Sequence, residues 1–146
     1  ADQAILEQEA VLSTLRDLQQ AGLVRAVGMS TKTVAGGLQA VECCDLVMAT
    51  YNLRQREELP VIRAAHAAGK GVLIKKGLLS GHLSNLTQVD PVRAALQLVY
   101  AEPGVSSIVI GALNPVHLRA NAALAEWALG ERCSTRRCGH NELSGF

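Results

Sequence analysis

Residues 58–76, ELPVIRAAHAAGKGVLIKK, decide the fold because they contain a helix and a strand separated by a glycine. Pro60 suits the first turn of a helix, and Gly69 suits the residue just after its end. The run that follows, GVLIKK (71–76), is apolar at consecutive positions rather than at alternate ones. Such a run is typical of a strand in a parallel sheet covered by helices. The stretch therefore predicts a helix that leads into a buried strand.

The alternation of helix and strand continues on both sides of this stretch. Apolar residues recur at helical spacing where helices are expected, and short apolar runs follow each of the first four helices. The predicted strands are 24–30, 45–52, 71–76 and 106–111, and the predicted helices lie near 11–21, 34–41, 57–68, 90–100 and 115–129. This repetition predicts an α/β fold with a parallel sheet. Either a small open sheet or half of a (β/α)8 barrel fits, because a full barrel needs about 250 residues.

Composition excludes several classes of protein. The 146 residues are 49% apolar and 18% charged, with a formal net charge of +1. This balance does not favour a nucleic-acid partner, and no apolar run approaches the ~20 residues that cross a membrane. Four cysteines are too few for a secreted disulfide scaffold, so we expect a cytoplasmic protein. Because the chain begins at Ala1 rather than Met, we expect a fragment or a processed product.

The last residues differ from the rest. The apolar periodicity stops near Leu129, so we expect one structured region over 1–128 and a disordered or atypical tail over 129–146. Cys133, Cys138 and His140 lie close together in the tail, but a tetrahedral zinc site needs a fourth ligand. The pair Cys43-Cys44 is far away in sequence, and we predict no metal site.

Four segments carry a resemblance to a known family. They are LRDLQQAGLVRAVGMST (15–31), YNL (51–53), GKGVLIKKGLLSGHL (69–83) and SSIVIGALNPVHLRANAAL (106–124). Together, over about residues 5–128, they resemble the C-terminal half of the aldo-keto reductases. The resemblance implies strands five to eight of a (β/α)8 TIM barrel, with their helices. It also implies hydride transfer between NADPH or NADH and an aldehyde or ketone. The family's catalytic Asp, Tyr, Lys and His come from its second to fourth strands, so we assign no catalytic residue and expect no activity from this chain alone.

The resemblance also indicates which residues would hold the nicotinamide end of the cofactor. Ser30 matches a serine that hydrogen-bonds the carboxamide, and Thr31 stands where the family often has Asn. Met48 replaces a carboxamide-binding Gln, and we expect it in the core. Lys75 or its neighbour Lys76 would approach a cofactor phosphate, since no aromatic residue follows the third strand.

The segment GALNPVHLRAN (111–121) would hold the adenosine end. A strand ends at Gly111, and Asn114-Pro115 begins a helix whose free N–H groups attract anions. Gly111, Ala112 and His117 stand where the family commonly has Lys, Ser and Arg against the 2′-phosphate, so NADP and NAD both remain open as cofactors. Asn121 matches an adenine-contacting Asn.

The glycine-containing loop 77–81 resembles a loop that passes over the pyrophosphate. Two histidines receive no firm role: we expect His66 to be exposed on its helix, and His82 to lie in the loop near the cofactor. The leading hypothesis is therefore the cofactor-binding half of an NAD(P)H-dependent carbonyl reductase, with a nicotinamide dinucleotide and a small carbonyl substrate as partners. The alternative is a non-catalytic remnant or interaction module that self-associates through open strand edges.

Overall fold

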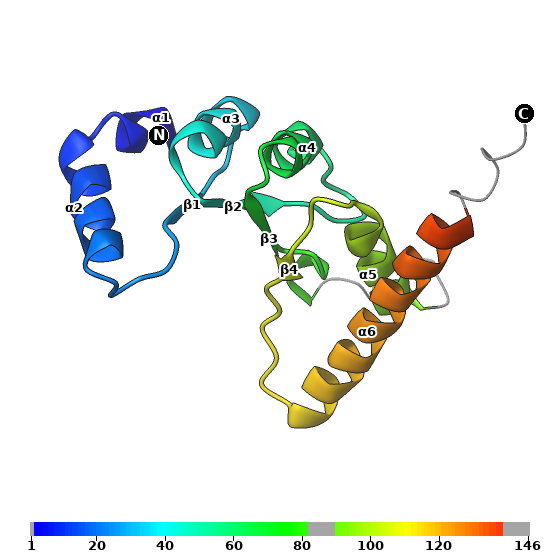
Figure 1. The fold of residues 1–146 in the computed structure, drawn as a ribbon. Helices are drawn as coiled ribbons and strands as arrows, with labels where there is room; N and C mark the ends of the chain where they lie inside the picture. The colour runs from blue at the N-terminus through cyan, green and yellow to red at the C-terminus, as the bar shows by residue number, and fades with distance from the viewer. Residues whose placement is uncertain (1, 82–89, 139–146) are drawn as a thin grey trace, which may run out of the picture.

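The computed structural model describes residues 2–81 and 90–138 of the chain. Helices and strands alternate after two initial helices, and the chain runs through them in one direction around the sheet (Figure 1). The elements are α1 (Asp2–Leu6), α2 (Glu9–Gln20), β1 (Gly28–Ser30), α3 (Val34–Cys43), β2 (Leu46–Thr50), α4 (Leu59–Ala67), β3 (Gly71–Lys75), α5 (Pro91–Ala101), β4 (Ser107–Ile108) and α6 (Pro115–Cys138).

The four strands form one parallel sheet in the order β1-β2-β3-β4. This confirms the predicted fold class and the four strands. The two edge strands are shorter than predicted. β1 begins only at Gly28, because the N–H of Val27 donates to the carboxylate of Asp45 at 2.9 Å rather than to a strand carbonyl.

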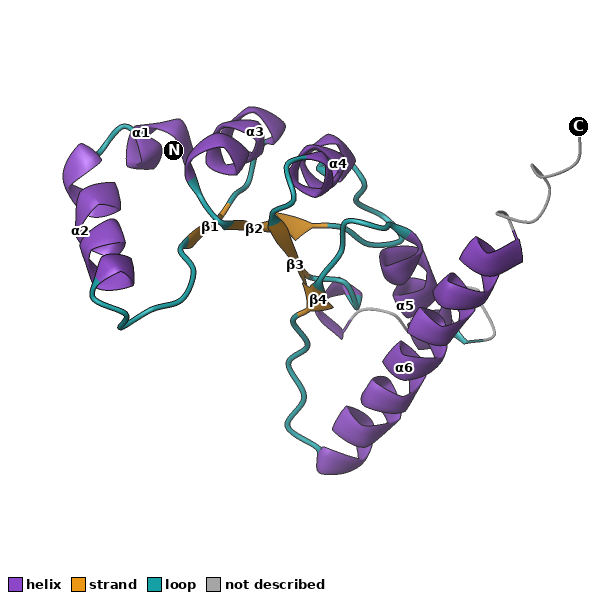
Figure 2. Cartoon of the chain, in the orientation of Figure 1, coloured by secondary structure: helices purple, strands orange, loops and turns teal. Residues whose placement is uncertain are grey.

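The sheet has one face covered by helices and one face that none of the described helices covers (Figure 2). Toward α3, α4 and α5 lie side chains with no solvent exposure, among them Val47, Val72 and Ile74. On the other face, called the open face below, Leu46 and Leu73 are only half-buried. Alternate residues of a strand point to opposite faces, so the strands are apolar along their length while only one face is packed.

Polar side chains cap the starts of three helices. The Thr33 hydroxyl accepts the N–H of Gly36 at 3.1 Å at the start of α3. Asp90 accepts the N–H of Arg93 at 3.0 Å before α5. Asn114 accepts the N–H of Val116 at 2.9 Å at the start of α6. Each cap satisfies a backbone donor that has no partner within its own helix.

The last helix is longer than the sequence predicts. α6 runs to Cys138, so the boundary expected at Leu129 falls within a helix. Ala128 is buried, and the guanidinium of Arg93 on α5 lies 3.9 Å from the ring centroid of Trp127. These contacts hold the middle of α6 against α5. The rest of the expected tail, 139–146, and with it His140, lies outside the described residues.

The N-terminus contains a short helix that the sequence does not predict. Leu6 of α1 is buried in the core, and Asp2 is 6% exposed. The Asp2 carboxylate accepts the N–H groups of Lys32 and Thr33 at 2.8 and 2.9 Å and the Thr33 hydroxyl at 3.0 Å. These bonds hold the pKa of Asp2 below its usual value, the largest cause being the Lys32 N–H. α1 therefore adds a second cap to the start of α3.

None of the described helices has the length and hydropathy needed to cross a membrane.

Candidate functional site

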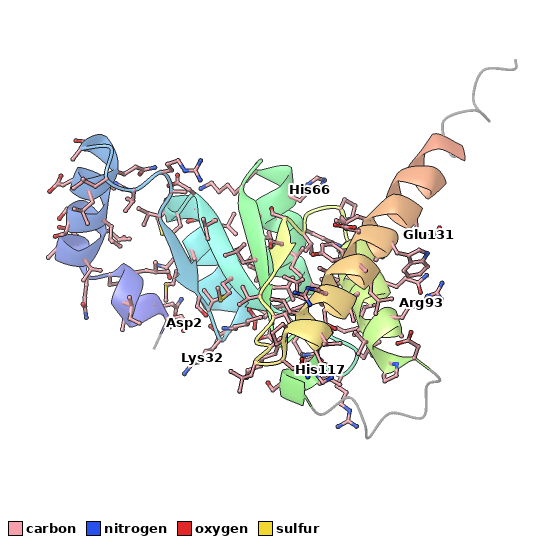
Figure 3. All side chains as sticks on the ribbon, turned by 90° about the horizontal axis from the view of Figure 1, so that it is seen from below. Asp2, Lys32, His66, Arg93, His117 and Glu131 are labelled. Carbon is pink, nitrogen blue, oxygen red and sulfur yellow. The ribbon has the colours of Figure 1, made fainter. Side chains whose placement is uncertain are left out.

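Two neighbouring hollows lie at the edge of the sheet where the strands end. The loops that follow β1 and β4 lie at this edge. Figure 3 labels Lys32 in the first loop and His117 just after the second. The first, the strand-end hollow, has a volume of about 530 Å³. The second, the loop cavity, has a volume of about 960 Å³. Lys76 lines both, so the two hollows adjoin.

Lys75 lines the strand-end hollow and contacts Ser30, which is not one of the residues that line it. Lys75 is the last residue of β3, and its Nζ donates to the Ser30 hydroxyl oxygen at 2.8 Å. The same Nζ donates to the carbonyl of Thr31. Because β2 lies between β1 and β3, the lysine side chain crosses that strand on the open face. Two of the predicted residues, 45 positions apart in sequence, are thus brought into direct contact.

Thr31 does not point into this hollow. Its side chain is fully buried, and its hydroxyl donates to the Glu58 carboxylate at 3.3 Å. The backbone N–H of Thr31 donates to the Met48 carbonyl at 3.2 Å. Since Ser30 and Thr31 are consecutive, their side chains point to opposite sides of the sheet. Thr31 does not line the hollow, although its carbonyl accepts a hydrogen bond from the lining residue Lys75.

Met48 lies elsewhere than expected. We predict it in the core, but it is half-buried on the open face, in register with Ser30 on one side and Leu73 on the other. The helix-facing positions of β2 are taken by Val47 and Ala49, so Met48 falls on the opposite face. It therefore lies beside Ser30 without a polar group to offer a ligand.

The loop cavity gathers the predicted residues of the adenosine end. Gly111, Ala112, His117 and Asn121 all line it. Gly111 and Ala112 follow β4, whereas His117 and Asn121 lie one helical turn apart on α6. The opposite wall includes Gly77, Ser80 and Gly81 of the turn after β3. The segment 111–121 and the loop 77–81 are therefore neighbours, as the resemblance implies.

The turn after β3 passes close to β4 at Gly77. A Cβ added there would overlap the end of the Ile108 side chain, which would have to shift. The turn also contains three non-glycine residues with positive φ, at Lys76 (56°), Leu79 (52°) and Ser80 (53°). Such conformations are uncommon for side-chain-bearing residues and are maintained by surrounding contacts.

Asn52 supplies one of those contacts. It is fully buried, and its Nδ2 donates to the Lys76 carbonyl at 3.1 Å and to Gln55 at 3.2 Å. Its Oδ1 accepts the N–H groups of Arg54 and Gln55 at 3.0 and 2.8 Å. The loop after β2 is thereby tied to the turn after β3. The only sequence signal for this role is a polar residue directly after an apolar strand.

The remaining candidates do not join either hollow. His66 is exposed on α4, as expected, and His82 lies outside the described residues. A smaller hollow of about 230 Å³ is lined by Cys43, Cys44 and Lys70, together with residues of α2. Burial raises the pKa of the Cys44 thiol to about 11, so it is an unreactive neutral thiol at neutral pH. Among the residues that the structure describes, no group of three or more His, Cys, Asp or Glu side chains could hold a metal ion.

Comparison with known proteins agrees with this geometry. Consecutive parallel β/α units in sequence order, with hollows at the strand ends, are typical of (β/α)8 barrels. The solved structure titled "Crystal structure of the PA4992, the putative aldo-keto reductase from Pseudomona aeruginosa" is 47% identical, with a TM-score of 0.78, over 88% of this chain. A second one, "Putative aldo-keto reductase from Pseudomona aeruginosa", has the same identity and TM-score over the same share. No protein-family model and no curated protein matches the chain.

Over 88% of its length the chain is therefore similar to putative aldo-keto reductases, whose structures are (β/α)8 barrels. It spans about half the length of the two solved relatives, covering 47% and 48% of their chains. The four described β/α units therefore correspond to half of such a barrel.

Proposed function

We propose that this chain is the dinucleotide-binding half of an oxidoreductase that reduces an aldehyde or ketone to an alcohol with NADPH or NADH. The observation that carries the proposal is the loop cavity. One short segment supplies Gly111, Ala112, His117 and Asn121 to it, and the glycine-containing turn after β3 forms the opposite wall. Its volume of about 960 Å³ lies at the upper end of the range for small-molecule sites.

The loop cavity suits the phosphate and adenosine end of a dinucleotide. A Cβ added at Gly111 would meet no atom within 4 Å, so the backbone there is open to a ligand. α6 begins at Pro115, which has no N–H, and Asn114 already accepts the N–H of Val116, so this helix end offers a ligand the positive end of its dipole rather than these two donors. His117 and Asn121 add side-chain hydrogen-bonding groups along the same helix.

The strand-end hollow suits the nicotinamide end. Ser30 does not line it but is exposed, and it is bonded to the lining residue Lys75; because its oxygen accepts that bond, its hydroxyl hydrogen can be donated to a ligand. Because Lys76 borders both hollows, a dinucleotide would run along the turn after β3 from one to the other. When bound, the dinucleotide supplies the hydride. The residues of this chain bind and orient it, which contributes to rate by positioning.

The proposal is tested by titrating the chain with NADPH and NADH while following the fluorescence of the reduced nicotinamide. We expect saturable binding with a Kd near or below about 1 mM. Gly111→Phe fills open space in the cavity and should weaken binding at least tenfold. Gly130→Phe is the matched control, because Gly130 also has no atom near an added Cβ but does not line the cavity. Binding that Gly111→Phe leaves unchanged, or no binding of either dinucleotide, would overturn the proposal.

A second candidate function is an interaction module. α2 contains no buried residue, although Val11, Leu12, Leu15 and Leu18 share its apolar side. β1 and β4 are also unpaired on their outer edges among the described strands. A second copy of the chain would cover these surfaces. Association that is unaffected by the Gly111→Phe variant, together with the absence of dinucleotide binding, would favour this function over the first.

A further inference from the structure

The fixed charges that line the loop cavity cancel, which leaves one histidine to decide its net charge. Among the described residues of the cavity wall, Lys76 supplies a positive charge and Asp90 a negative one. His117, on the first turn of α6, is the third charged or titratable side chain of this wall (Figure 3). The described wall is therefore neutral overall when His117 is neutral, and it carries one positive charge when His117 is protonated.

The other charged groups of the neighbouring elements are directed elsewhere. Arg119 lies two positions after His117 on α6, so it belongs to a different side of the helix, and it does not line the cavity. On α5, which packs against α6, the guanidinium of Arg93 lies over the ring of Trp127. The Asp90 carboxylate accepts the backbone N–H of Arg93 at the start of α5. In the part of the chain that the structure describes, no carboxylate lies within salt-bridge distance of His117.

The imidazole of His117 can respond both to pH and to an anion. His117 is exposed, so it exchanges protons with water, and histidine side chains ordinarily change charge between about pH 5 and 8. A protonated imidazole donates hydrogen bonds from both ring nitrogens, and its bonds to a phosphate are charge-assisted. The contribution of His117 to anion binding in the cavity should therefore grow as the pH falls through this range.

We propose that His117 makes the choice between NADP and NAD at the loop cavity depend on pH, with NADP favoured in acid. This dependence rests on the proposed function, in which the phosphate and adenosine end of a dinucleotide occupies the cavity. NADP carries one phosphate monoester more than NAD, and such a group has a charge of about −1.5 to −2 at pH 7. A positive charge added to a neutral wall attracts the dinucleotide with the extra phosphate more strongly.

The size of the effect follows from Coulomb's law. Because His117 is exposed, the dielectric constant of water applies. Opposite unit charges about 4 Å apart in water attract by the equivalent of about fivefold in affinity. The ratio of the dissociation constants of NAD⁺ and NADP⁺ should therefore rise about fivefold between pH 8 and pH 5.5.

Calorimetric titration of the 146-residue chain with NADP⁺ and NAD⁺ at pH 5.5, 6.5 and 8 tests this. The oxidised forms are used because the reduced ones decompose in acid. His117→Gln keeps a neutral polar side chain, and the ratio should then change less than twofold over this range. His117→Arg keeps the charge at every pH and should preserve the preference for NADP⁺ at pH 8. His66→Gln is the matched control, because His66 is exposed on α4 and does not line the cavity, and it should retain the rise of the unaltered chain.

Proton uptake on binding gives a second readout. Titrations at pH 6.5 in two buffers with different enthalpies of ionisation should show that the unaltered chain takes up more protons with NADP⁺ than His117→Gln does. A ratio that rises as steeply in His117→Gln, or equal proton uptake in the two chains, overturns the inference. A rise that His82→Gln abolishes and His117→Gln does not would also overturn it; His82 lies outside the described residues. Binding of both dinucleotides would in each case leave the proposed function intact, whereas binding of neither at any pH overturns both.

Discussion

Asn52 offers the sharpest test of how the site is built. Its side chain makes four hydrogen bonds of 2.8–3.2 Å, to the backbone of Arg54, Gln55 and Lys76 and to the side chain of Gln55. Asn52→Ala removes all four and leaves a small void at a fully buried position. A typical hydrogen bond contributes about 1 kcal/mol net, and the exposed loop groups recover some bonds to water. We therefore expect a loss of about 2–3 kcal/mol.

Thermal unfolding followed by circular dichroism at one fixed chain concentration measures this loss. At roughly 2–4 °C per kcal/mol for a chain of this size, Tm should fall by about 5–10 °C. Gln97→Ala removes an exposed amide on α5 and serves as the control, with a change within about 0.5 kcal/mol. A Tm for Asn52→Ala within 1 °C of the control would refute the reasoning, because the turn after β3 would then be held by other contacts.

Three further predictions concern the N-terminus, the cofactor and the open face. The pKa of Asp2 is lowered in the folded chain, so the stabilisation by its carboxylate is complete above the unfolded pKa near 4 and is lost as pH falls through the folded pKa. Asp2→Asn should therefore lower Tm at pH 7 and have less effect in strong acid. Thermal melting at a series of pH values checks this. Replacing Gly111 by Lys and His117 by Arg in a completed barrel should shift the NADPH/NADH affinity ratio at least tenfold toward NADPH in a fluorescence titration, since charge-assisted bonds to phosphate contribute ~1.5–3 kcal/mol each. The purified chain should self-associate or bind a hydrophobic dye, as judged by sedimentation at micromolar concentration; a monomer that unfolds cooperatively without binding dye contradicts this.

Local sequence signals predicted much of the fold and part of the site. Thr33, Asp90 and Asn114 stand at the starts of helices that the sequence predicts. Such starts can be predicted because a cap bonds to an N–H only two or three residues away. Gly111 and His117 line the loop cavity together because both belong to one short segment after a strand, but the family resemblance, and not a local signal, singled them out. Features that depend only on residues close together in the chain can therefore be predicted from a single sequence.

Contacts between distant residues account for what the sequence did not reveal. Asp2 bonds to residues 30 and 31 positions away, and the Asn52 amide reaches a carbonyl 24 positions away. Neither pairing has a local signature. The orientation of Thr31 is different: the period-two alternation of strands puts consecutive side chains on opposite faces of the sheet, and this rule is available from sequence. With Ser30 on the open face, it places the Thr31 hydroxyl on the helix-covered face, where it meets Glu58.

The open face is less apolar than a sequence of buried strands suggests. Its positions on the edge strands are Gly28, Ser30 and Ser107, so its larger apolar side chains belong to the two central strands and to Val109. Several hundred Å² of exposed apolar surface, at ~25 cal/mol per Å², would cost on the order of 10 kcal/mol. The small residues at the edges keep the actual cost below that figure, which makes a folded half-barrel feasible while leaving the central stripe to favour association.

The open face and the strand-end hollow are coupled through Lys75. Its side chain crosses β2 on the same face that a partner, or the other half of a barrel, would cover. Covering this face removes water from around the ammonium and lowers the local dielectric constant, which strengthens every charge interaction there. The bond between Lys75 and Ser30 should therefore contribute more to stability in an assembly that closes the sheet than in the isolated chain. Measuring how far Lys75→Met lowers Tm at increasing chain concentration tests this: a loss that grows as the chain associates supports closure over this face, and a constant loss places the association elsewhere.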